Sequence, residues 1–205
     1  MKRTLASPFV LLIACAAIAS ALPAPMAAQS QASPAAPAWL RAPAISPDGQ
    51  TIAFTYRGDI YRVPAAGGAA VPLTTHDAHD TKPVWSHDSR WIAFASERFG
   101  NFDVFVMPAS GGPARRLTYH SAAELPYSFT PDVKSVLFGA ARLDIAANRQ
   151  FPTGSQPELY SVPVAGGRAV QVLATPAEDA SYSRDGRFLI YHDKKGGENE
   201  WRKHH

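Results

Sequence analysis

The chain has 205 residues, of which 46% are hydrophobic and 18% are charged, a balance typical of a globular protein rather than a disordered one. Its formal net charge is +3, and two of the basic residues, Lys2 and Arg3, stand at the N-terminus. Because the rest of the chain is nearly neutral, its composition argues against a nucleic-acid-binding or membrane-surface protein.

The N-terminal segment predicts export. Residues 1–30 combine a basic start, an almost wholly apolar run from Phe9 to Leu22, and small or polar residues that suit cleavage by a signal peptidase. The apolar run is too short to span a bilayer, which requires about 20 helical residues. We therefore expect a secretory signal peptide, a flexible leader over 31–41, no integral membrane span, and a location in the bacterial periplasm.

Cys15 is the single cysteine, so the chain cannot form an intramolecular disulfide. It follows Leu12-Ile13-Ala14, which resembles the box before the lipidated cysteine of bacterial lipoproteins. Lipid anchoring at Cys15 is therefore an alternative to ordinary signal cleavage. The apolar run continues beyond Cys15 as far as Ile18, which favours cleavage further downstream.

The remainder of the chain contains an internal repeat, with copies over about 42–80, 81–124, 125–179 and 180–205. Each copy begins with a turn that holds an aspartate, and the turn acids Asp48, Asp88, Asp132 and Asp185 are 40, 44 and 53 residues apart. The last interval is long because residues 142–157 insert a loop in the third copy. We expect this loop to lie on one rim of the fold, where it influences partner or substrate selection.

Each part of the repeat predicts β-structure. The sequence Ser46-Pro-Asp-Gly49 predicts a tight turn, because proline fixes its own φ, aspartate can hydrogen-bond to its own backbone, and glycine accepts a positive φ. Thr51–Tyr56 is rich in β-branched and aromatic residues, as buried strands are, and Asp59–Val63 alternates like a half-buried strand. Gly67-Gly68 predicts a hairpin turn, and the prolines Pro64, Pro108 and Pro163 are expected at strand ends.

A repeat of about 40–50 residues is that of a propeller blade. We therefore predict an all-β fold, a β-propeller with four-stranded blades, incomplete in this chain, which supplies three blades and the start of a fourth. A blade cannot cover both of its sheet faces alone. Further blades of a longer protein, or self-association that completes the ring, would cover the exposed faces.

No complete catalytic, cofactor-binding or metal-binding set is predicted in this chain. His76 and His79, with Asp77 or Asp80, have a spacing that suits a metal site, but no cysteine or further histidine cluster supports a metal. The segment is therefore expected to be a polar connector between blades. The turn serines and acids recur in the repeat, which marks them as structural. Two further histidines, His204 and His205, are expected to belong to another strand.

An aromatic group in the second copy has two interpretations. It could form a surface on which nucleic-acid bases stack, but the basic groove that would accompany such a surface is absent. The repeat positions instead predict blade core for all five residues, which are Trp85, Trp91, Phe94, Phe99 and Phe102.

The pattern from Trp85-Ser-His-Asp88 to Leu117-Thr118 resembles the propeller repeat of the periplasmic Tol-system translocation protein and of tricorn-type proteases. Residues 197–205, Gly-Glu-Asn-Glu-Trp-Arg-Lys-His-His, look like a segment in the propeller of exported, tricorn-like serine peptidases. In that family, further blades, a peptide-binding module and a serine peptidase domain follow.

The resemblance implies that this chain gates or docks peptides for a peptidase domain absent from it. None of the family's catalytic residues falls within the sequence, so none is assigned here. The alternative is a non-catalytic periplasmic scaffold for protein–protein interaction, similar to the Tol-system translocation protein.

Overall fold

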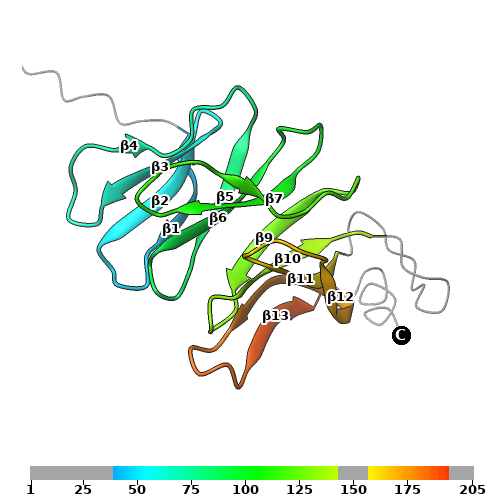
Figure 1. Ribbon diagram of the computed structural model, residues 1–205. Coiled ribbons are helices and arrows are strands. Elements are labelled where there is room, and N and C mark those ends of the chain that lie inside the picture. Colours follow the sequence, from blue (N-terminus) through cyan, green and yellow to red (C-terminus); the bar gives the residue numbers. More distant parts are fainter. Residues whose placement is uncertain (1–38, 143–156, 194–205) are drawn as a thin grey trace, which may run out of the picture. The chain divides into compact units, whose positions relative to one another are not determined.

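The computed structural model describes residues 39–142 and 157–193, and all regular structure within them is β-strand (Figure 1). Consecutive strands pair antiparallel and form sheets that follow one another along the chain. The all-β architecture of four-stranded blades, predicted from the repeat, is confirmed. The export segment, Cys15, the inserted loop over 143–156, and the C-terminal segment with His204 and His205 lie outside the described residues.

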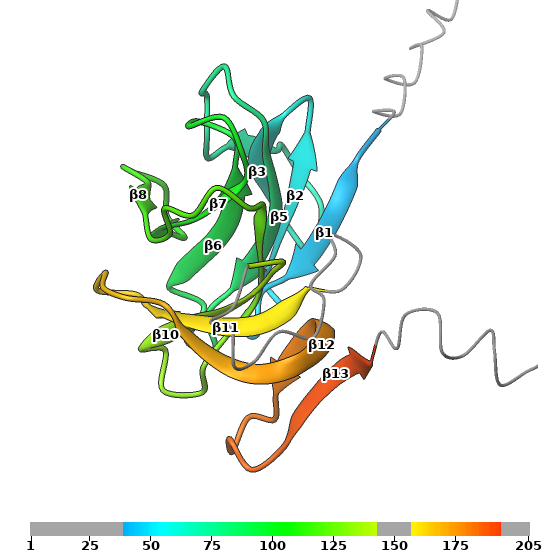
Figure 2. The ribbon, with the colours of Figure 1, turned by 90° about the vertical axis from the view of Figure 1, so that its right-hand side faces the viewer.

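The first two repeats each fold into one four-stranded antiparallel sheet, called a blade here (Figures 1 and 2). The strands of blade 1 are β1 (Arg41–Ile45), β2 (Thr51–Tyr56), β3 (Asp59–Pro64) and β4 (Val71–Pro72). The strands of blade 2 are β5 (Asp80–Trp85), β6 (Trp91–Ser96), β7 (Asp103–Pro108) and β8 (Arg115–Arg116). The prolines predicted at strand ends stand there.

Blades 3 and 4 share a strand. Blade 3 contains β9 (Glu124–Phe129), β10 (Ser135–Ala140), β11 (Glu158–Pro163) and the first part of β12 (Val170–Tyr182). The second part of β12 pairs with β13 (Leu189–Asp193) and begins blade 4. The connector between blades has five residues in the first two copies, at 75–79 and 119–123, but three in the third, at 174–176. With so short a connector, the strand continues without a break.

One hydrogen-bond pattern builds the turn of every copy. The Ser46 hydroxyl donates to Asp48 Oδ1 at 2.5 Å, and the Gln50 N–H donates to the same oxygen at 3.0 Å. The other copies repeat both bonds with Ser86 and Asp88, Thr130 and Asp132, and Ser183 and Asp185. The hydroxyl bond is the main cause of a lowered pKa for the Asp48 carboxyl. The prediction that these acids are turn residues is confirmed.

The hydrophobic core lies between blades. One cluster joins Ala53 and Ile60 of blade 1 to Phe94 and Met107 of blade 2, and a second joins blade 2 to blade 3. A third cluster joins blade 3 to the inner part of β12. Full burial of a side chain such as Phe94 contributes about 2–3 kcal/mol, so each blade is stabilised mainly by its neighbours.

The aromatic group of blade 2 is only partly in the core. Phe94 is fully buried, and the half-buried Trp85 uses its indole N–H to donate to the Ala44 carbonyl of blade 1 at 2.9 Å. The prediction is wrong for Phe99, which is 60% exposed. Phe99 lies in the loop after β6, outside the strands that bury the repeated apolar positions, and its ring stacks on Phe105.

Candidate functional site

The histidines between blades 1 and 2 have separate local partners. His76 Nδ1 accepts the N–H of Ala78 at 3.0 Å, and the His79 ring meets the edge of Phe102. Asp80 is fully buried and pairs with Arg98 at 2.9 Å. Across residues 39–142 and 157–193, no group of three or more His, Cys, Asp or Glu side chains is placed to hold a metal ion. The segment is a polar connector that joins two blades.

Four buried carboxylates stand at the starts of strands: Asp80, Asp103, Glu124 and Glu158. The sequence analysis considered Asp80 only as a possible metal ligand and missed the other three. Arg116 pairs with Asp103 at 2.8 Å, and Arg142 pairs with Glu124. Burial is the main cause that raises the pKa of Asp103, and the Arg116 hydrogen bond opposes it.

Repetition indicates that two of these ion pairs, Asp80–Arg98 and Glu124–Arg142, are structural. Arg98 and Arg142 stand at equivalent positions after the second strand of their blades, and each pairs with the acid that begins the first strand. Each guanidinium also lies over two aromatic rings, Phe94 and Phe105 for Arg98, and Phe138 and Tyr160 for Arg142. An arrangement present in successive blades serves blade stability rather than one chemical reaction.

The first strands of the blades, called the inner strands here, are β1, β5, β9 and the second part of β12, and each contacts the next. A β-bulge interrupts every inner strand. In β1, β5 and β12 it lies four residues before the serine that begins the following turn, and in β9 it lies three residues before the turn threonine. The bulge residues Ala42, Lys82 and Asp179 have φ of 46°, 50° and 48°. Bulges of this kind redirect side chains, so Lys82 and Asp179 leave the regular alternation of their strands.

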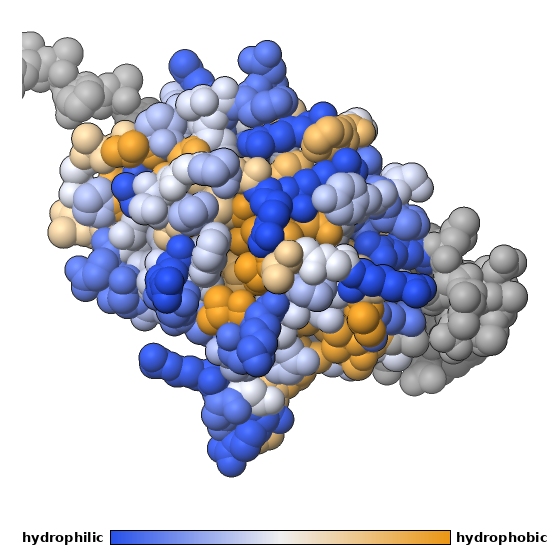
Figure 3. Space-filling view, in the orientation of Figure 1, coloured by the Kyte–Doolittle hydropathy of each residue, from blue (hydrophilic) through white to orange (hydrophobic). Residues whose placement is uncertain are grey.

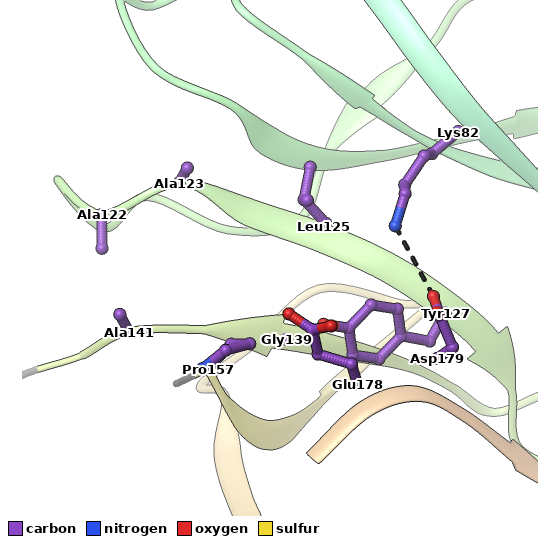
Figure 4. A pocket seen from close by; sticks show the side chains of 10 residues that line it. All are labelled: Lys82, Ala122, Ala123, Leu125, Tyr127, Gly139, Ala141, Pro157, Glu178 and Asp179. Carbon is purple, nitrogen blue, oxygen red and sulfur yellow. Dashed lines mark ion pairs between the residues drawn. The ribbon is translucent and has the colours of Figure 1, made fainter. Parts of the chain in front are cut away.

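A pocket of about 440 Å³ lies on the inner strands where these bulges meet (Figure 4). Three blades line it, with Lys82 from β5, Leu125 and Tyr127 from β9, and Glu178 and Asp179 from β12. Small residues complete the wall, with Ala122 and Ala123 in the connector before β9, Gly139 in β10 and Ala141 just after it. The pocket therefore combines an apolar floor with charged groups at its edge.

Gly139 sets the position of the Tyr127 ring. A Cβ at Gly139 would overlap the hydroxyl and ring atoms of Tyr127, so the absence of a side chain at Gly139 leaves room for the ring. Burial is the main cause that raises the pKa of Tyr127, and the charges of Glu178 and Asp179 add to it. The phenol is therefore neutral at physiological pH.

The charged side chains meet across the pocket. The Lys82 ammonium lies 3.6 Å from Asp179 Oδ1 and 5.5 Å from the centroid of the Tyr127 ring (Figure 4). His192 of β13 approaches Asp179 from the other side, with Nδ1 at 3.5 Å from Oδ2. The geometry provides a carboxylate and an aromatic face that together suit a cation.

The sequence analysis missed all of these pocket residues. They lie on segments whose sequence pattern predicted β-strands and no functional role. The bulges that redirect Lys82 and Asp179 are defined by pairing with the neighbouring strand, which the sequence does not reveal. One signal was available: aligning the copies on their turns places Ala42, Lys82, Pro126 and Asp179 at the same position, where side chains of very different chemistry stand.

A family model described as the tricorn protease N-terminal β-propeller domain matches residues 37–205. Among solved structures, the putative TolB from Agrobacterium tumefaciens aligns with a TM-score of 0.64 and 22% identity, over 78% of this chain and 55% of that one. TolB from Acinetobacter baumannii aligns with a TM-score of 0.61 and 22% identity, over 77% of this chain and 39% of that one.

A third similar structure, from a nidogen/laminin complex, aligns with a TM-score of 0.56 and 13% identity, over 75% of this chain and 56% of that one. At these identities the likeness concerns the fold, and it supports the propeller architecture. The chain spans about half the length of the first of these structures. No helix among residues 39–142 and 157–193 has the length and apolar character needed to cross a bilayer.

Proposed function

Because the chain belongs to the family of tricorn protease N-terminal β-propeller domains, we propose that it is the propeller part of an exported, tricorn-like serine peptidase. In this proposal, residues 1–30 direct export to the periplasm. The blades then gate or dock peptide substrates for a peptidase domain that lies outside the described residues.

The observation that carries this proposal is the pocket on the inner strands. Its volume of about 440 Å³ accommodates a side chain or two of a peptide rather than a folded partner. Apolar groups such as Leu125 stand beside the charged Lys82, Glu178 and Asp179, so the pocket offers both burial and orientation. Because strands from three blades form it, the site exists only once the blades have assembled.

The test is direct binding of short labelled peptides to the whole chain, followed by fluorescence anisotropy. Ala123 is exposed and lines the pocket, so Ala123→Trp fills the pocket with little effect on the core. Ala66→Trp, in the exposed turn between β3 and β4, is the matched control. We expect Ala123→Trp to abolish peptide binding and Ala66→Trp to leave it unchanged; equal binding by both would contradict the proposal.

The second candidate function is a non-catalytic scaffold for protein–protein interaction. Strand β13 favours it, because among the described residues this strand lies at the edge of its sheet and exposes Ile190 and, just before its start, Phe188. An exposed edge with apolar side chains can accept a strand from a partner or from a second copy. The turn beside it, between β12 and β13, is hydrophilic on the face shown in Figure 3.

Sedimentation velocity distinguishes the two functions. If the scaffold function holds through self-association, Ile190→Lys shifts the chain from a defined oligomer to monomer and leaves peptide binding unchanged. A chain that is monomeric with or without this substitution, and that binds peptides, supports the peptidase-associated function.

A further inference from the structure

We propose that the inner-strand pocket recognises the ammonium group of a peptide, and that the Lys82 ammonium takes this place when no peptide is bound. The inference rests on the proposed function, because it names the chemical group that the docked peptide presents. Its basis is the Lys82 ammonium itself, which lies 3.6 Å from the Asp179 carboxylate and 5.5 Å from the centroid of the Tyr127 ring. This pairing of an aromatic face with an anion is how proteins hold organic cations.

The backbone directs both charges into the pocket. Lys82 and Asp179 are the bulge residues of β5 and β12, with φ of 50° and 48°, a region that side-chain-bearing residues seldom adopt. Ala42 adopts the same conformation in β1, with φ of 46°. The bulge is therefore a property of the inner strand, and the choice of lysine and aspartate at this position determines the chemistry of the pocket.

The internal ion pair can be exchanged for a ligand. The side chains of Lys82 and Asp179 are 40% and 57% exposed, and ion pairs in contact with solvent contribute little to stability. The lysine stem is long and flexible, so the ammonium can move into solvent while the backbone bulge stays in place. A peptide ammonium that enters the pocket gains the contacts that Lys82 releases.

The charge of the lining selects a cation over an anion. Among residues 39–142 and 157–193, the lining contains one basic side chain, Lys82, and two acidic ones, Glu178 and Asp179. When Lys82 turns away, the Asp179 carboxylate remains beside a neutral phenol ring. His192 of β13 also contacts Asp179, with its Nδ1 at 3.5 Å from Oδ2.

An ammonium group can come from a lysine side chain or from the free amino terminus of the peptide. The experiment therefore compares three labelled peptides of the same length with the whole chain. The first has a central lysine and a blocked amino terminus, the second replaces the lysine with norleucine, and the third has norleucine and a free amino terminus. Norleucine preserves the aliphatic length and removes the charge.

Variants of the chain identify the groups responsible. Lys82→Ala removes the internal ammonium, and Ala42 shows that alanine accepts the bulge conformation. Asp179→Asn removes the carboxylate charge and keeps a residue that tolerates positive φ. Lys134→Ala is the matched control, because Lys134 forms a Lys–Asp pair of the same 3.6 Å length with Asp132 on a turn that does not line the pocket.

We expect the lysine peptide to bind about tenfold more tightly than the blocked norleucine peptide. Lys82→Ala should increase the affinity for the lysine peptide by about threefold. Asp179→Asn should reduce that affinity to the level of the blocked norleucine peptide, and Lys134→Ala should leave it unchanged. If the third peptide matches the first, the amino terminus is the natural source of the ammonium; if it matches the second, the lysine side chain is.

Two results would overturn the inference. Equal binding of all three peptides, or weaker binding of the lysine peptide by Lys82→Ala, would show that the pocket does not select an ammonium, while the proposed docking function would stand. Absence of binding by every peptide would overturn the docking function as well. Thermal unfolding of each variant, monitored by circular dichroism, establishes that the measured change belongs to the pocket.

Discussion

Arg62 and Arg115 each donate a hydrogen bond to the next blade, one from the third strand of its blade and the other from the fourth. The Arg62 guanidinium on β3 donates to the Ala109 carbonyl of the next blade at 2.9 Å, and Arg115 on β8 donates to the Ala165 carbonyl of its next blade at 3.1 Å. Arg62 faces Val71 across its hairpin and Arg115 faces Val106, so arginine and valine have exchanged strands between the blades. The hydrogen bond between blades, called the clamp here, therefore depends on which carbonyl the guanidinium contacts and not on which strand carries the arginine.

These clamps predict unequal losses of stability. Arg62→Ala should lower the free energy of unfolding by about 1 kcal/mol, because a partly buried charged donor is lost. Arg115→Ala should cost less, because its bonds are exposed to solvent. Urea denaturation measures both variants, and an Arg62→Ala variant as stable as the parent would contradict this account.

The ion pair between Glu124 and Arg142 should be costly to break. Glu124 is fully buried, and Glu124→Leu leaves the Arg142 guanidinium without its carboxylate, so we expect a loss of about 3 kcal/mol. The double variant Glu124→Leu with Arg142→Met should be more stable than Glu124→Leu alone, because the methionine keeps the contacts with Phe138 and Tyr160. A double variant less stable than the single one would show that the charges themselves are required.

Gly139→Ala tests the packing of the pocket floor. The added methyl group would overlap the Tyr127 ring, so the substitution should cost about 2 kcal/mol through overpacking. Tyr127→Ala in the same chain removes the overlap, and the second substitution should then cost less than it does in the parent. Thermal unfolding of the four chains in this cycle gives the coupling, and strictly additive effects would argue against the contact.

The turn carboxylates should make stability depend on pH. The hydroxyl of Thr130 and the N–H of Lys134 hold the pKa of Asp132 below its ordinary value of 3.8. A lowered pKa in the folded state stabilises the fold above pH 3.8, and this contribution is lost as the pH falls through the folded pKa.

Asp132→Asn removes the titrating charge and keeps the shape of the side chain. The variant should therefore be slightly less stable than the parent at neutral pH, and the difference should shrink as the pH falls below 3.8. The effect is small because the carboxylate is exposed. Urea midpoints at several pH values provide the measurement, and a difference that does not change with pH would exclude the charge as its cause.

The sequence predicted the parts of the fold that local chemistry determines. The turn at Asp48 needs only neighbouring residues, and the strand Thr51–Tyr56 needs only its own β-branched and aromatic side chains. For this reason the repeat led directly to the blades. The exposed Phe99 shows the limit of the same reasoning, because aromatic character alone does not distinguish a strand from the loop that follows it.

The candidate site could not be predicted in the same way. Lys82 and Asp179 are 97 positions apart, and they meet only because the inner strands of blades 2 and 4 both contact β9. The bulges that turn both side chains are defined by pairing with neighbouring strands, not by a local motif. The burial and pairing of the carboxylates could not be predicted for a related reason, since the arginines that neutralise Asp80 and Glu124 are each 18 residues further along the chain.

The uninterrupted strand β12 determines which parts of the molecule unfold together. Blades 1 and 2 are joined by a connector that can unfold locally, whereas blades 3 and 4 share one continuous hydrogen-bonded ladder. Amide protons of β11 and β13 should therefore exchange with solvent in a single cooperative unit, because neither sheet can be released without severing the strand common to both. The carboxylate side of the pocket belongs to this unit, and the lysine side belongs to a separate one.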